Sequence, residues 1–157
     1  MANQDPITSR IIGCAYRVSN ELGSGFLEKV YENALAFELR RQGLGAVQQR
    51  GIEVHYEGQI VGDFIADLLV ENQIIVELKA VRELEDIHVA QGINYLKATG
   101  LPTCLLINFG TPKIQIRRLM MDKANGRFNN ILEEGLASAP SVGFPCGTEL
   151  FASDGQR

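Results

Sequence analysis

The spacing of apolar residues changes twice along the chain, and this change constrains the fold more than any other feature of the sequence. Apolar residues recur every three or four positions over residues 6–23 and 26–43, which predicts two amphipathic helices. Over residues 46–81 the period becomes two, which predicts strands. Helical spacing returns over residues 85–100, with Asp86 as the expected N-cap.

Turn residues divide the segment of period two. Breaks are expected at Gly51, at residues 57–58 and at residues 71–73, so the segment is predicted to form antiparallel hairpins. After the third helix, residues 103–109 and 113–120 read as two further strands.

The predicted order is helix, helix, three strands, helix, two strands. This order indicates an α/β (α+β) fold in which a central mixed sheet is flanked by helices. We expect one domain over residues 1–121. Residues 122–157 are expected to form a C-terminal extension, with a short helix over residues 129–136 and a weakly ordered tail.

Composition narrows the function classes. The net charge of −4 gives no general attraction to nucleic acid or to anionic membranes, so any nucleic-acid contact must come from a local basic cluster. No apolar run approaches the roughly 20 residues that cross a bilayer, and the N-terminus has no targeting layout. We therefore expect a cytoplasmic protein without membrane contact.

The cysteines and histidines are too few and too dispersed for a zinc site or a disulfide framework. Cys14, Cys104 and Cys146 form no paired motif, and the chain has only His55 and His88. Cys14 and Cys104 have apolar neighbours in the sequence. We expect both to be reduced packing residues.

The strand at residues 74–81 carries two charges among apolar residues. Glu77 and Lys79 are two apart and therefore project from the same face. If residues 71–73 form a three-residue loop, Asp67 on the preceding strand opposes Glu77 and shares that face. A two-residue loop would place the two carboxylates on opposite faces of the sheet. The loop length therefore decides whether Asp67 and Glu77 can form one site.

Directly opposed carboxylates repel, so a cation is expected between them. Lys79 compensates one charge, and Mg²⁺ or Mn²⁺ bound by oxygen ligands would compensate more. From spacing alone, an ion pair on a solvated sheet face remains the alternative.

Two predicted helices carry polar side chains on one face. Gln91 and Tyr95 are one turn apart, with His88 beside them, and Glu28 and Tyr31 are neighbours on the second helix. Each set has a simpler explanation as the solvent face or first turn of a helix.

Taken together, the motifs resemble the bacterial GxxExxY protein family, a branch of the PD-(D/E)XK nuclease superfamily. The similarity extends over roughly residues 7–120. The motifs, in order, are Gly25 to Tyr31, Asp67, Glu77-Leu78-Lys79 and Gln91 to Tyr95. Ala66 replaces the proline of the superfamily motif, a position on which no chemistry depends.

The resemblance implies a restriction-endonuclease-like core with a divalent-metal site. By position, Asp67 and Glu77 match metal-binding carboxylates, and the Leu78 carbonyl is a further ligand. Lys79 matches the lysine that orients the attacking water and stabilises charge. Glu28 matches a helical glutamate that supplements the metal site.

The remaining motif residues are implied to support the site or bind the substrate. Gln91 and Tyr95 match a Q-x-x-x-Y motif that contacts the scaffold or the nucleic-acid strand, and Tyr31 supports the site from the second helix. The basic residues near the site in sequence are too scattered to predict a groove. They are Arg50, Lys79, Arg82, Lys97, Arg117 and Arg118.

Three functional readings follow. The leading one is a Mg²⁺-dependent phosphodiesterase, a nuclease, that acts on DNA and accepts Mn²⁺ as a substitute. The second is a catalytically weak nucleic-acid-binding or partner-binding module. The third is a protein-interaction or ligand-binding module on the same fold, unrelated to nucleic acid. The sequence does not decide whether the protein forms a homodimer, or whether its substrate is DNA or RNA and single- or double-stranded. It also does not decide between endo and exo action, and it does not give the sequence specificity or the pathway.

Overall fold

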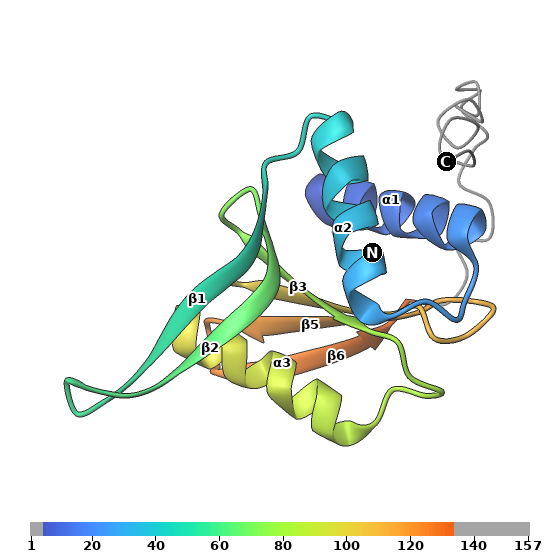
Figure 1. Cartoon of the computed structure of the whole chain (residues 1–157). Helices are drawn as coiled ribbons and strands as arrows, with labels where there is room; N and C mark the ends of the chain where they lie inside the picture. Colours follow the sequence, from blue (N-terminus) through green and yellow to red (C-terminus); the bar gives the residue numbers. More distant parts are fainter. Residues whose placement is uncertain (1–4, 134–157) are drawn as a thin grey trace.

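The structure is a computed structural model, and it describes residues 5–133 of the 157-residue chain (Figure 1). Its helices and strands form one mixed sheet with helices on both faces. The elements are α1 (Pro6–Leu22), α2 (Glu28–Arg41), β1 (Ala46–Tyr56), β2 (Gln59–Val70), β3 (Ile74–Lys79), α3 (Asp86–Thr99), β4 (Thr103–Asn108), β5 (Gln115–Asp122) and β6 (Arg127–Leu132).

The six strands follow the order of the chain across the sheet. All neighbouring pairs are antiparallel except β3 and β4, which are parallel because α3 crosses over between them. Helices α1 and α2 lie on one face and α3 on the other, while the β1–β2 hairpin extends away from the body (Figure 1). The predicted α+β fold with a central mixed sheet is confirmed.

The sheet divides the core into two apolar clusters. The larger cluster joins α1 and α2 to alternate residues of the inner strands, including Leu68, Val76 and Leu78. The smaller one lies under α3, where Gly92 lets the helix approach the sheet closely. A Cβ atom at Gly92 would lie 2.5 Å from Cδ1 of Leu119, so this position has no room for a side chain.

The loop that decides the register of the β2–β3 hairpin has the predicted length. Val70 pairs with Ile74, and the residues between them form a three-residue turn. Glu71 and Asn72 take φ values of 52° and 55°, in the left-handed region. This turn confirms the odd loop that puts Asp67 opposite Glu77.

Two predictions about the strands were wrong. Gly51 does not break the first strand, because it stays extended and pairs with Ile65 in the ladder. Residues 129–132, expected to begin a short helix, belong to β6, which pairs antiparallel with β5. The rest of that expected helix and most of the expected tail lie outside the described residues.

Of the two capping residues predicted for α3, the C-cap is correct and the N-cap is wrong. Gly100 is the C-cap in the left-handed conformation. At the other end Glu85, and not Asp86, is the N-cap, because the His88 side chain accepts a hydrogen bond from the Glu85 main chain in a capping box. His88 therefore serves the helix terminus.

Two further expectations concern helices and thiols. Within residues 5–133, no helix has the length and apolar character that a membrane span requires. Cys14 and Cys104 are free and buried, as predicted for packing residues. Cys146 lies outside the described residues.

Candidate metal-binding site

Asp67 and Glu77 each bind the main chain of the other's strand. The main-chain N–H of Asp67 donates to Oε1 of Glu77 at 3.1 Å, and the N–H of Leu78 donates to Oδ2 of Asp67 at 2.8 Å. The regular β2–β3 pairing ends just before this point, at Leu68 and Val76. Carboxylates thus replace main-chain carbonyls as acceptors where the two strands diverge. Within residues 5–133, the second oxygen of each carboxylate has no hydrogen-bond partner.

The other neighbour of β2 is also irregular at this position. Gln48 pairs with Leu68 and Arg50 pairs with Ala66, so Gln49 lies opposite Asp67. Gln49 has a φ of 55°, which is uncommon for a residue with a side chain. The ladders on both sides of Asp67 are therefore interrupted. Such local strain is typical of functional sites.

Glu32 on α2 holds the irregular segment of β1. Its side chain is buried and accepts hydrogen bonds from Nε2 of Gln48 at 3.0 Å, Nε2 of Gln49 at 2.9 Å and Nζ of Lys29 at 2.9 Å. Burial acts to raise the pKa of Glu32, but these hydrogen bonds lower it below its usual value. Glu32 is therefore ionised, and it ties α2 to the strand segment opposite Asp67.

Glu28, Asp67 and Glu77 share this region with Lys79, and the charges of Glu32 and Lys29 also reach it. Burial, and then the charge of Asp67, raise the pKa of Glu77 to about 8. Burial also raises the pKa of Asp67, although the Leu78 N–H and Lys79 oppose the increase. At the start of α2, partial burial and the charge of Asp67 raise the pKa of Glu28. All three pKa values are raised, so Lys79 does not offset the burial and mutual repulsion of these carboxyl groups.

Lys79 lies at the end of β3 and is half-buried. Its positive charge acts on all three carboxyl groups, Glu28, Asp67 and Glu77. In the part of the chain that the structure describes, Lys79 makes no direct ion pair, so its ammonium group is available to a ligand.

The chemistry of these donors fits a hard divalent cation. All the available ligands are oxygen atoms, and a divalent charge would relieve the repulsion between the buried Glu77 and the half-buried Asp67. Among residues 5–133, no three or more His, Cys, Asp and Glu side chains are grouped to hold a metal ion. A cation here would therefore depend on one or two carboxylates, with main-chain and water oxygens as its other ligands, as is common for Mg²⁺.

Gln91 and Tyr95 on α3 approach the carboxylates from the other side. Nε2 of Gln91 donates to the Tyr95 hydroxyl at 3.0 Å, and Tyr95 packs edge-on against Phe64 with ring centroids 5.5 Å apart. Burial, and then the charge of Glu77, raise the pKa of Tyr95 to about 12. The Tyr95 hydroxyl is therefore a neutral hydrogen-bonding group near the carboxylates.

Tyr31, one turn after Glu28 on α2, lies in the larger core. Its ring is fully buried and stacks on Phe109, with centroids 4.7 Å apart. Its hydroxyl donates to the carbonyl of Gly23 at 2.6 Å and accepts from the N–H of Phe26 at 3.2 Å. Tyr31 therefore fixes the loop that leads into Glu28.

Sequence reasoning missed Asn108, whose side chain is fully buried beside the end of β3. It binds the main chain of Val81 and Gly110 and the side chain of Gln115. The signal that identified Glu77, a polar residue in an apolar strand, was also present here in the segment Thr103–Asn108. The importance of Gln49 had no comparable signal, because nothing in the sequence predicts its left-handed backbone.

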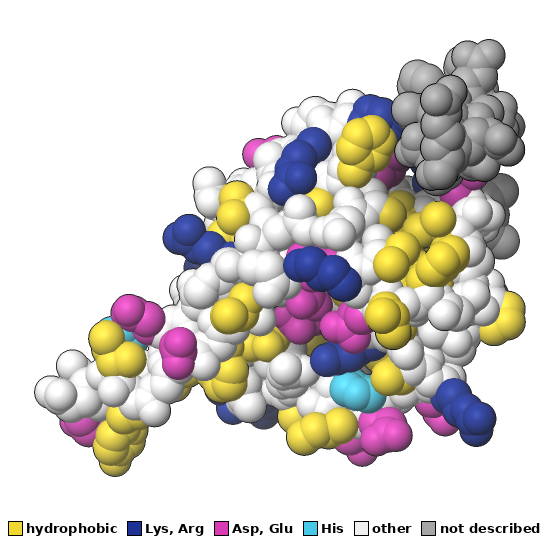
Figure 2. Space-filling view, viewed as in Figure 1, with side chains coloured by type: hydrophobic (Ala, Val, Ile, Leu, Met, Phe, Trp, Pro, Cys, Tyr) yellow, Lys and Arg dark blue, Asp and Glu magenta, His cyan; other side chains and the backbone are white. Residues whose placement is uncertain are grey.

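Acidic side chains gather near the middle of the face where α2 begins over the sheet, with basic side chains beside them (Figure 2). Two of the basic residues noted in the sequence already have partners within the protein. Arg118 is buried and paired with Glu133 at 2.9 Å, and Lys97 lies over the ring of Phe128 at 5.5 Å. Arg50 has no carboxylate partner among the residues described.

Comparison with known proteins identifies a family. A family model described as the PD-(D/E)XK nuclease superfamily matches residues 5–119, which include every residue of the site described above. No curated protein and no solved structure matches the chain significantly.

Proposed function

Since the chain belongs to the PD-(D/E)XK nuclease superfamily, we propose that it is a divalent-metal-dependent nuclease that hydrolyses phosphodiester bonds in DNA. The observation that carries this proposal is the crossed pairing of Asp67 and Glu77 beside Lys79. We further assign the chain to the GxxExxY branch, on the motif from Gly25 to Tyr31.

Asp67, Glu77 and the Leu78 carbonyl are the proposed metal ligands. Glu28 is proposed to supplement their negative charge without being a third direct carboxylate ligand. The N–H and C=O of one strand residue point to the same side, and the Leu78 N–H is bound to Asp67, so the Leu78 carbonyl faces the gap between the strands. A bound Mg²⁺ or Mn²⁺ ion would activate water for attack and withdraw charge from the phosphate.

The protein's own groups orient the reactants and balance charge. The Lys79 ammonium group donates hydrogen bonds to the attacking water or to a phosphate oxygen, where negative charge increases during attack. The bonds from the Asp67 and Leu78 N–H groups fix one oxygen of each carboxylate, so the other is held in position. The hydrogen bond between Glu32 and Gln49 holds the irregular segment of β1 opposite Asp67.

Gln91 and Tyr95 are proposed to support the site and contact the nucleic-acid strand. The neutral hydroxyl of Tyr95 can donate a hydrogen bond to phosphate without adding negative charge. Tyr31 supports the site indirectly, through the loop before Glu28.

The proposal includes the assembly and location expected from the sequence. A homodimer is supported by the long edge strand β1 and by apolar side chains exposed on the β1–β2 hairpin, among them Tyr56, Ile60 and Val61. We also propose a nuclease-like domain over residues 1–121, an extension over residues 122–157 and a cytoplasmic location.

The test is cleavage of single- and double-stranded DNA with Mg²⁺ by the wild type, Glu77→Gln and Lys79→Ala. We expect both variants to lose cleavage by about 100-fold or more while keeping the wild-type circular dichroism. Glu83→Gln, a change at an exposed carboxylate, is the control and should cleave normally. Full cleavage by both site variants would refute the proposal. Binding of DNA without cleavage by the wild type would instead support the binding-module alternative.

A further inference from the structure

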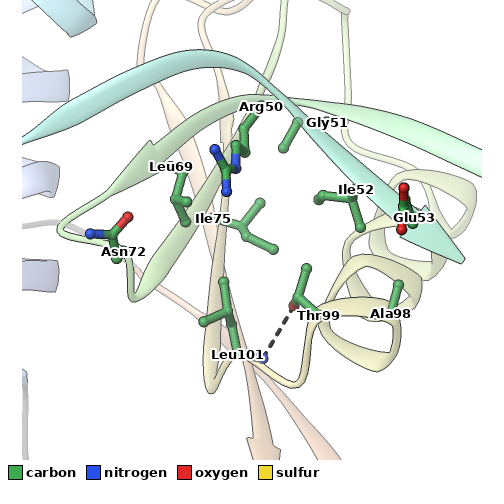
Figure 3. A pocket seen from close by; sticks show the side chains of 11 residues that line it. Arg50, Gly51, Ile52, Glu53, Leu69, Asn72, Ile75, Ala98, Thr99 and Leu101 are labelled. Carbon is green, nitrogen blue, oxygen red and sulfur yellow. Dashed lines mark hydrogen bonds between the residues drawn. The ribbon is translucent and has the colours of Figure 1, made fainter.

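An open cavity of about 360 Å³ lies between the β1–β2–β3 part of the sheet and the C-terminal end of α3 (Figure 3). Its volume is within the range of sites that bind small organic groups. Its apolar lining comes mainly from Ile52, Leu69, Ile75 and Leu101. None of these residues belongs to the site proposed above.

The cavity is adjacent to the paired carboxylates on the sheet. Leu69 and Ile75 are paired in the β2–β3 ladder, and each is two residues from Asp67 or Glu77. Two residues along a strand span about 6.6 Å. This is close to the separation of successive nucleotides in an extended nucleic-acid strand. A strand with one phosphate at the carboxylates can therefore present a neighbouring nucleotide to the cavity.

The cavity combines an apolar floor with the positive charge of Arg50 and, at its other end, the carboxylate of Glu53, which is paired with His55. The guanidinium group of Arg50 points from β1 into the cavity, toward Ile75 (Figure 3). Within residues 5–133, Arg50 forms no ion pair or side-chain hydrogen bond. Asn72 lines the same cavity from the β2–β3 turn and offers both a donor and an acceptor.

A nucleotide has the chemistry that these groups recognise. The flat face of a nucleobase is apolar enough for Leu69 and Ile75, and its edge hydrogen-bonds to an amide such as Asn72. Its phosphate matches a guanidinium group, which binds phosphate oxygens in a bidentate manner. A base enters such a cavity only when it is unpaired.

We propose that this cavity binds one unpaired nucleobase of the substrate strand, next to the site of cleavage, and that Arg50 binds the adjoining phosphate. This inference rests on the nucleic-acid substrate of the proposed function. It implies that the substrate is a single strand, or a duplex with an unpaired or displaced end.

The test measures the binding of a short fluorescent single-stranded DNA by anisotropy, in the Glu77→Gln background, with strand integrity checked on a gel. Arg50→Ala and Ala98→Trp, which fills the cavity from α3, should each weaken binding by roughly 5- to 100-fold, as loss of one base contact does. Arg127→Ala removes an exposed arginine from the opposite edge of the sheet. It is the charge-matched control and should leave the Kd unchanged.

A second series removes one base at a time from the strand. In the Glu77→Gln protein, removal of the base at one position should weaken binding more than removal at any other position. Adding Ala98→Trp should abolish this difference between positions. Wild-type affinity in both cavity variants, or equal effects of all abasic positions, would overturn the proposal. Equally tight binding of a free nucleoside monophosphate would also overturn it, because the cavity would then serve a free ligand.

Failure of this inference can be told apart from failure of the proposed function. If the wild type cleaves DNA and Glu77→Gln does not, but the cavity variants bind normally, only the cavity assignment fails. If binding depends on the cavity but the wild type cleaves no strand with Mg²⁺ or Mn²⁺, the cavity assignment holds and the nuclease proposal fails. A wild type that binds no nucleic acid would overturn both.

Discussion

Asn108 binds Val81 through both polar groups of the Val81 main chain. Its side-chain oxygen accepts from the Val81 N–H at 3.0 Å, and its side-chain nitrogen donates to the Val81 carbonyl at 2.9 Å. The same oxygen also accepts from the N–H of Gly110 at 3.0 Å. Because Val81 follows Lys79 by two residues, this contact fixes the chain immediately after the proposed catalytic lysine.

Asn108→Leu is expected to lower both stability and activity. It leaves half-buried main-chain polar groups of Val81 and Gly110 without the Asn108 side chain as partner, which should reduce the free energy of unfolding by about 2 kcal/mol. Loss of the support for Lys79 should reduce cleavage by about 10- to 100-fold. Urea denaturation and a cleavage assay at a temperature where the variant is folded measure the two effects. Asn129→Leu, on exposed β6 backbone, is the control, and an equal loss in both variants would contradict this role.

Magnesium ions should stabilise the folded protein through the carboxylate pair. A ligand that binds only the folded state adds about 2.7 kcal/mol at 100 times its Kd, so the melting temperature should rise with Mg²⁺. The rise should disappear in Asp67→Asn and in Glu77→Gln and persist in Glu83→Gln. Calorimetric titration provides the matching Kd. A rise of equal size in all four proteins would show that Mg²⁺ acts elsewhere.

The metal-free protein should lose stability as the pH rises from about 4.5 to about 8. Burial and the charge of Asp67 raise the pKa of Glu77 to about 8 in the folded state, from an ordinary value of 4.5. A carboxyl group with a raised pKa binds its proton more tightly when folded. Its contribution to stability is therefore complete below about 4.5 and is lost as the pH approaches 8. Urea denaturation with a chelator, across this interval, should give a steeper loss for the wild type than for Glu77→Gln.

The left-handed backbone at Gln49 predicts a difference between two substitutions. Gln49→Val and Gln49→Gly both remove the hydrogen bond to Glu32, but only glycine adopts a φ of 55° freely. The valine variant should therefore unfold with a free energy about 1–2 kcal/mol lower than the glycine variant. Equal stabilities would show that the left-handed conformation is not maintained in solution.

Gly92→Ala should separate α3 from the sheet. The added Cβ atom would meet Cδ1 of Leu119 at 2.5 Å and Sγ of Cys104 at 3.3 Å, and such overpacking costs about 1–3 kcal/mol. Gly13→Ala, in α1, meets no atom within 4 Å and should be neutral or stabilising by up to about 1 kcal/mol. Thermal denaturation of the two variants compares them directly, and a similar change in both would contradict the close contact.

The parts of the fold that depend on local periodicity could be predicted from the sequence. The pairing of Val70 with Ile74 follows from a three-residue loop in which Asn72 tolerates a left-handed conformation, and the position of Asp67 opposite Glu77 follows from that pairing. The left-handed conformation of Glu71 had no such signal. Strand β6 was missed because residues 127–132 lack a sustained apolar pattern; the strand is half-exposed and is held by the ladder with β5.

Other features depend on contacts between distant segments. Gln49 owes its conformation to Glu32, 17 positions earlier, and Val81 is held by Asn108, 27 positions later. Gly51 was misread because glycine marks a turn in many sequences, yet here an extended glycine continues the ladder opposite Ile65. Tertiary contacts of this kind override local preference.

The crossed bonds between Asp67 and Glu77 also bear on how the protein reaches its native state. The two residues lie on one hairpin and are 10 positions apart, and hairpins form in about 1–10 μs. Glu28 and Tyr95 come from helices that must dock onto the sheet, which is a slower, non-local event. We expect the carboxylate pair to meet early in folding, while water still surrounds it and weakens its repulsion. Docking of the helices would then bury a site whose chain geometry is already set.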